Sequence, residues 1–249
     1  MRSAISARPL VTALAAASFM AAPATASAID VSGFAVTPGS SQAGANADLG
    51  IDFDLADGDV RDIVIHLPPG LVGNPLATPL CLEEQLKNDS CPAATDVGDI
   101  SNVINAMDIP FPVTASGNVY NVVPRPGEPA RFGFVLKAAG DLLDPVVLQS
   151  PAALRPTDFG LDTILRDVPD DVDGIPIQIT SVSLDLLGQV GSPPQGFLRN
   201  PTSCGINSFT VDVTGYDWVV LTSVTGSAAN AMGSSPRRAP AAAKVPTFS

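Results

Sequence analysis

The chain is poor in the residues on which most enzyme sites depend. It contains 1 histidine, His66, and no G-x-S-x-G sequence, so a Ser-His-Asp or Cys-His arrangement would have to use this one side chain. A multi-histidine zinc site is excluded for the same reason. Because His66 lies in an apolar stretch that runs into Leu67 and Pro68, we interpret it as an ordinary strand residue. The sequence predicts no cofactor and a protein that is not an enzyme.

Basic and aromatic residues are scarce as well. The chain has 13 basic residues against 25 acidic ones, a formal net charge of -12, and such a surface repels phosphate backbones and anionic membranes. A nucleic-acid partner is therefore excluded. Only 1 Trp and 2 Tyr are present, although sugar-binding proteins usually stack their ligands on such rings. Trp218, close to Tyr216, is a candidate platform, but we favour a core position because Trp is highly buried on average.

The chain has 3 cysteines, and their spacing predicts a disulfide. Cys81 and Cys91 bracket a short segment in which Leu82 and Leu86 are four residues apart, as on one face of a short helix. A bridge between the two cysteines closes a loop of about ten residues and stabilises it by roughly 3 kcal/mol. Cys204 is then left without a partner, which suggests the hypothesis that the chain is truncated.

The N-terminal residues 1–28 are typical of a secretory signal peptide. Arg2 and Arg8 provide the positive start, an apolar run follows, and Ala26-Ser27-Ala28 fits an A-x-A cleavage site. A membrane anchor needs about 20 apolar residues, and this run is shorter. We therefore predict a secreted, extracellular protein that does not span a membrane after the signal is removed.

Alternation of apolar and polar residues predicts strands in most of the mature chain. Residues 47–55 alternate strictly, and residues 63–67 place Ile63, Ile65 and Leu67 on one face. The Asp-Gly-Asp turn at 57–59 predicts that these two strands form an antiparallel hairpin. Further along, the alternation changes phase near Thr180 and Ser181, which predicts a β-bulge.

Turn residues recur between these strands. The chain has 24 prolines and 21 glycines, and turn signals every 8 to 12 residues are typical of a sandwich. We predict an all-β fold, an antiparallel β-sandwich of Ig-like architecture, with one short helix inside the disulfide loop.

Acidic clusters are the remaining candidates for a site. Asp170, Asp171 and Asp173 precede Gly174 and are candidate calcium ligands, because hard oxygen ligands on loops suit calcium. However, Pro169 occupies the first ligand position of the D-x-[DN]-x-[DN]-G pattern. A solvated acidic loop is therefore the favoured interpretation, and we predict no metal site.

Several blocks of the sequence resemble a known family. LPPGLVGNP, CPAATDVG, VYNVVPRPGEPARFGF and LRNPTSC occur in this order between about Ala47 and Cys204. Together they resemble recurring blocks in a family of uncharacterised secreted proteins from high-GC actinobacteria. The resemblance implies a secreted β-rich module of bacterial origin, followed in longer members by similar modules. It brings no activity, substrate or catalytic residue.

These observations predict four segments and two functions. The segments are a signal peptide at 1–28, a main sandwich at 29–190, the start of a second, truncated β module at 191–226, and a disordered tail at 227–249. The preferred function is non-catalytic, a structural or interaction role at the cell envelope with an envelope polymer or another protein as partner. The alternative is a glycan-binding or hydrolytic protein with an acidic, calcium-dependent site.

Overall fold

The computed structural model describes residues 29–107, 109–138, 143–216 and 222–230. Its strands are β1 (Asp30–Pro38), β2 (Leu49–Ala56), β3 (Val60–His66), β4 (Val72–Gly73), β5 (Asp96–Ala106), β6 (Val113–Val122), β7 (Arg131–Ala138), β8 (Val146–Leu154), β9 (Leu161–Leu165), β10 (Asp171–Val172), β11 (Ile175–Leu186), β12 (Gln189–Val190), β13 (Gln195–Gly196), β14 (Leu198–Arg199), β15 (Gly205–Gly215) and β16 (Thr222–Asn230). The α-helix α1 (Glu83–Lys87) and the 3₁₀ turn η1 (Ala93–Thr95) precede β5.

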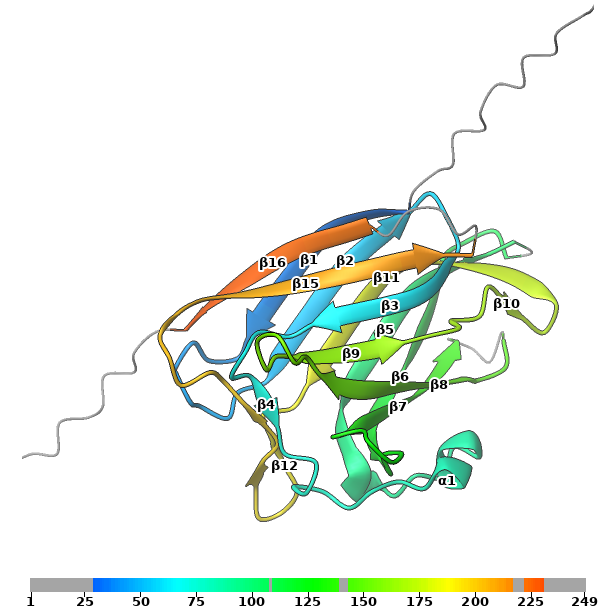
Figure 1. Cartoon of the computed structure of the whole chain (residues 1–249). Helices are drawn as coiled ribbons and strands as arrows, with labels where there is room; N and C mark the ends of the chain where they lie inside the picture. Colours follow the sequence, from blue (N-terminus) through cyan, green and yellow to red (C-terminus); the bar gives the residue numbers. More distant parts are fainter. Residues whose placement is uncertain (1–28, 108, 139–142, 217–221, 231–249) are drawn as a thin grey trace, which may run out of the picture.

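One continuous sheet folds over on itself and forms two facing layers. The strand order is β1-β2-β11-β5-β6-β7-β8-β9-β3-β15-β16, with all named strand pairs antiparallel. In Figure 1, β8, β9, β3, β15 and β16 lie in front of β1, β2, β11, β5, β6 and β7. The change of layer occurs within β8, whose residues up to Pro151 pair with β7 and whose residues from Ala152 pair with β9. The predicted all-β antiparallel sandwich is confirmed.

The core lies between the two layers because the strands alternate. Along β2, Leu49, Ile51, Phe53 and Leu55 are all at most 4% exposed, whereas the residues between them face outward. The same alternation along β3, β5 and β15 supplies the facing side chains. At the open side of the sandwich, β16 comes close to β1, and the ring of Phe34 would lie 2.9 Å from a Cβ built on Gly226. A residue without a side chain is therefore needed at Gly226 for this close approach.

The predicted hairpin between the strands on either side of the turn at 57–59 is wrong. β2 pairs with β1 and β11, whereas β3 pairs with β9 and β15. The turn at 57–59 therefore carries the chain from one layer to the other instead of reversing it within a sheet. Alternation shows that one face of a strand is buried. It does not show whether two such strands pair in one layer or face each other across the core.

The predicted bulge is confirmed. The register between β11 and β5 shifts between Ile179 and Ser181, and the Thr180 hydroxyl donates a hydrogen bond to the Val103 carbonyl at 3.1 Å. The extra residue moves the apolar phase of β11 by one position. Both halves of this long strand therefore direct apolar side chains inward.

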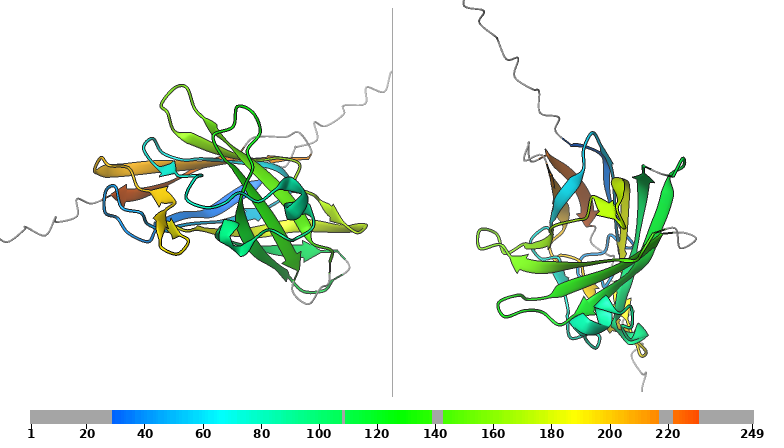
Figure 2. Two further views of the ribbon diagram at one scale, coloured as in Figure 1. Left: turned by 90° about the horizontal axis from the view of Figure 1, so that it is seen from below. Right: turned by 90° about the vertical axis from the view of Figure 1, so that its right-hand side faces the viewer.

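The disulfide loop packs against the outer face of the layer that contains β6 and β7. Cys81 and Cys91 are bonded, and α1 lies between them, as predicted. Cys81 and Leu86 are 0% exposed and form a small second core with Val122 and Val135. Cys81 also continues the sheet, because its amide donates to the Asn121 carbonyl at 2.8 Å. This loop covers the face of β7 that does not point into the main core, as the two views of Figure 2 show for the helical segment.

The C-terminal strands belong to the same sheet as the rest. β15 and β16, whose residues the sequence assigned to a second module and a tail, extend the front layer from β3. The predicted signal peptide at 1–28, Trp218 and residues 231–249 of the predicted tail lie outside the described residues. In the part of the chain that is described, no helix has the length and apolar character that crossing a membrane requires.

Candidate functional site

The predicted calcium candidates serve a turn. The Asp171 carboxylate accepts a hydrogen bond from the Gly174 amide at 2.9 Å, and that of Asp173 accepts one from the Asp144 amide at 3.1 Å. Asp170 contributes its backbone carbonyl to the Ile177 amide. Across the described ranges, no three His, Cys, Asp or Glu side chains gather as a metal site requires. The carboxylates of Asp171 and Asp173 therefore accept hydrogen bonds from backbone amides.

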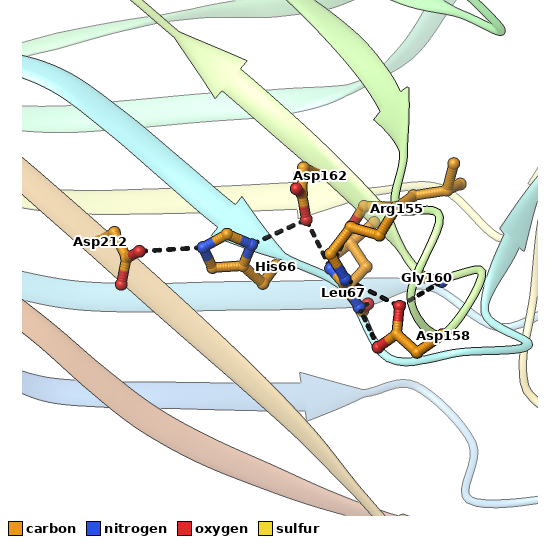
Figure 3. Close-up of polar contacts among 8 residues, drawn as sticks. His66, Leu67, Arg155, Asp158, Gly160, Asp162 and Asp212 are labelled. Carbon is orange, nitrogen blue, oxygen red and sulfur yellow. Dashed lines mark hydrogen bonds and ion pairs between the residues drawn. The ribbon is translucent and has the colours of Figure 1, made fainter.

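A polar cluster forms instead around His66, at the end of β3. Its Nδ1 lies 2.7 Å from Asp162 Oδ1 and its Nε2 lies 3.0 Å from Asp212 Oδ2 (Figure 3). Asp162 stands directly opposite His66 on β9, and Asp212 lies on β15, the other neighbour of β3. His66 therefore links three adjacent strands of the front layer through its side chain. This cluster was not predicted, because its members are far apart in the sequence.

The two hydrogen bonds favour the charged imidazolium. Partial burial of the ring lowers the pKa of His66, but the hydrogen bonds to Asp212 and Asp162 and their negative charges outweigh it, and the net pKa is raised. A doubly protonated ring can donate from both nitrogens, whereas a neutral ring can donate from one only. His66 thus acts as a charged clamp between two carboxylates.

Arg155 extends the cluster into the loop between β8 and β9. Its guanidinium donates to both carboxylate oxygens of Asp158 at 3.0 Å, to the Leu67 carbonyl at 2.7 Å, and to Asp162. Asp158 also accepts a hydrogen bond from the Gly160 amide at 3.0 Å. The hydrogen bonds that Arg155 donates to Asp158 lower the pKa of Asp158 and raise the pKa of Arg155. Figure 3 shows this second set of contacts continuing from Asp162.

The loop held by Arg155 presents an exposed aromatic ring. Phe159 is 72% exposed and has a φ of 61°, a left-handed conformation that costs a bulky residue about 1–3 kcal/mol. Asp158 accepts hydrogen bonds from Arg155 before it in the loop and from the Gly160 amide after Phe159. These bonds hold Phe159 in this conformation. Ile206, which is 77% exposed, lines the same shallow depression as His66, Arg155 and Asp158.

The geometry of this cluster does not suit catalysis. Both ring nitrogens of His66 are bonded to carboxylates, so neither has a lone pair directed at a hydroxyl nucleophile such as Ser208, which lines the depression. Asp162 and Asp212 lie on opposite sides of the imidazole, and the ring fills the space in which a glycosidic bond would have to lie. The arrangement clamps strands together and holds a loop.

Comparison with family models, with curated proteins and with solved structures finds no match for this chain. The resemblance to secreted actinobacterial proteins therefore stays a prediction, as does export. Tyr216, the neighbour of Trp218, donates its hydroxyl hydrogen to the Val168 carbonyl at 2.7 Å. This hydrogen bond fixes Tyr216 against the segment at Val168, which favours a structural role over a sugar platform.

A second feature is an apolar cavity between the layers. Its volume is about 160 Å³, and native interiors contain few voids larger than a water molecule. An empty cavity costs about 24 cal/mol per Å³, or roughly 4 kcal/mol at this size. That is a large part of the 5–15 kcal/mol by which domains are stable. The cavity therefore calls for an explanation in terms of function.

Proposed function

We propose that the protein is a secreted, non-catalytic β-sandwich module that binds another protein at the cell envelope. The buried disulfide supports an oxidising compartment, and the blocks LPPGLVGNP and LRNPTSC support membership of a secreted family. The observation that carries the interaction role is the loop at 155–160, in which Arg155 holds Phe159 exposed in a strained conformation. Strain that is retained at an exposed position is typical of functional loops.

The chemistry of this surface favours a protein partner over a polysaccharide. Phe159 and Ile206 are exposed and apolar, and rigid aromatic side chains are typical anchors of protein interfaces. Neither side chain has a polar edge that could bond to sugar hydroxyls. The net charge of -12 disfavours anionic envelope polymers because of like-charge repulsion. A neutral or basic protein surface with an apolar pocket is the complementary partner.

The test is retention of the mature protein on purified actinobacterial cell envelope. We expect Phe159→Asp to lower retention at least about tenfold, the effect of losing an interface anchor. Phe111→Asp is the matched control, because Phe111 is also exposed, at 57%, but lies in the loop between β5 and β6. Equal retention of the two variants and of the wild type would refute the proposal.

Two further measurements separate the partner classes. Protease treatment of the envelope should remove binding if the partner is a protein and leave it intact if the partner is a polysaccharide. Release of reducing sugars or peptides from the envelope on incubation would instead support the hydrolytic alternative. The proposal predicts no such release.

A further inference from the structure

The cavity between the layers is an apolar slot. Alternate residues of β2, β9 and β11 line its wall, together with Ile63 and Ile65 of β3 and Leu67 just after β3, and four residues of a strand span about 13 Å. These residues are Leu49, Ile51, Phe53, Ile63, Ile65, Leu67, Leu161, Thr163, Leu165, Val182, Leu184 and Leu186. A volume of only about 160 Å³ within a lining of this extent makes the space narrow. A linear chain fits such a shape better than a ring system does.

Small side chains create the slot. Ser150 and Ala152 stand where β8 passes from one layer to the other, and Thr163 is the direct cross-strand partner of Ala152. β2, β3, β5, β7, β11 and β14 place Leu, Ile, Val or Phe against the slot. The three small residues therefore leave the facing side chains of the back layer without a partner across the core.

The walls select against charge and against water. Ser150 and Thr163 are the polar side chains of the wall, and none of the lining residues is ionisable. An apolar cavity of this size stays dry and accepts apolar guests, since water finds too few polar partners in it. A charged group would be buried there without a counter-ion, at a high cost. The occupant of the slot is therefore uncharged along the part that enters.

The slot reaches solvent beside β4. Of its lining residues, Gly73 and Pro129 are exposed, and Pro75 and Ala130 are half-buried. Leu76, next to Pro75, is 87% exposed and extends the apolar surface beyond this opening. β4, which contains Gly73, lies at the lower edge of the layers in Figure 1.

The buried charge near the opening is already paired. Arg131 bonds with both carboxylate oxygens of Glu128 and with the Gln149 side chain at 3.2 Å. Arg131 is also buried, with 5% exposure, so it is not directed at an anionic head group outside the slot. Together with the negative net charge of the chain, this favours a neutral head group.

We propose that this slot binds the end of a neutral alkyl chain, with the chain leaving the protein past Leu76. The source of the chain is either a free compound such as an alkanol or the tail of a neutral lipid. The site is separate from the Phe159 surface, and the two proposals stand or fall independently.

The test is calorimetric binding of a series of n-alkanols, from butanol to dodecanol, to the mature protein. Affinity should rise with each added methylene until the slot is filled. A plateau after that point identifies a short free compound as the occupant. A continued rise, abolished by Leu76→Ser, identifies a longer chain that runs over the opening. Dodecanoate should bind at least about tenfold more weakly than dodecanol, because its charge cannot be paired at the opening.

Filling the slot is the decisive control. Ala152→Leu should weaken hexanol binding at least about tenfold, since its added carbons and the ligand cannot share a cavity of about 160 Å³. Thr163→Ile fills the same region with a residue that favours strands and replaces Ala152→Leu if that variant does not fold. Phe111→Ser, on the outer surface and outside the lining of the slot, should leave binding unchanged. Absence of alkanol binding to the wild type, or equal binding by a folded slot-filling variant, would overturn the proposal.

Discussion

The disulfide loop should contribute a measurable share of the stability of the fold. The bridge joins cysteines with a sequence separation of 10, and the chain-entropy relation for a loop of that length gives about 2.7 kcal/mol at 25 °C. We expect the double substitution Cys81→Ala and Cys91→Ala to lower the free energy of unfolding by this amount. Alanine is the better replacement because Cys81 is 0% exposed and a serine hydroxyl would be buried there.

The loss should also be visible locally. Without the bridge, the loop is held to the sheet by the packing of Leu86 against Val122 and Val135, by the backbone bonds of residue 81 and by the ion pair of Asp89 with Lys137. A helix of 5 residues is too short to persist by itself in water. The amide of Leu86, which donates to the Leu82 carbonyl, should therefore exchange with solvent faster than the amides of β5 and β6.

The assay is urea-induced unfolding of the wild type and the double variant, both carrying Cys204→Ser to prevent thiol exchange. We expect a lower midpoint and a melting temperature reduced by about 5 to 10 °C. The wild type measured in reductant should reproduce the variant. A difference below about 1 kcal/mol between oxidised wild type and variant would show that packing holds the loop, and the entropic reasoning would be refuted.

Three further changes probe the cluster, the buried ion pair and a close contact. Because the pKa of His66 is raised from 6.5, its stabilisation is fully present below that pH and is lost as the pH rises through the folded-state pKa, so His66→Gln should destabilise more at about pH 5.5 than at about pH 8.5 in urea unfolding. Glu128→Gln should cost about 3 to 5 kcal/mol in the same assay because it leaves the charge of Arg131 buried and unpaired. Gly133→Ala should cost about 1 to 3 kcal/mol, since the new Cβ would lie 2.6 Å from a methyl group of Leu86.

The glutamate and glycine substitutions each have a control that should have little effect. Glu83→Gln removes an exposed ion pair with Lys87 and should leave the urea midpoint nearly unchanged. Gly73→Ala places its Cβ 4.0 Å from the nearest atom and should be tolerated. A destabilisation by His66→Gln that grows with pH would contradict the role of His66 as a charged clamp. Equal effects of Glu128→Gln and Glu83→Gln would contradict the assignment of a buried charge to Arg131.

Part of this structure could be read from local sequence. Alternation at Leu49, Ile51 and Phe53 predicts a strand because side chains of a strand alternate between its faces, whatever its neighbours are. The change of phase at Thr180 predicts a bulge for the same reason. The bridge between Cys81 and Cys91 follows from short spacing, since the ends of a loop that small meet with little loss of entropy.

The tertiary structure alone decided which strands are neighbours and what lies between them. Alternation does not show whether β3 pairs with β2 in one layer or faces it across the core. The structure places β2 and β3 in opposite layers. His66 meets Asp162 and Asp212 only because β9 and β15 flank β3. The slot exists only because Ser150, Ala152 and Thr163 come to face the large side chains of the other layer. Periodicity is a property of the local backbone, whereas pairing and packing depend on residues far apart in the chain.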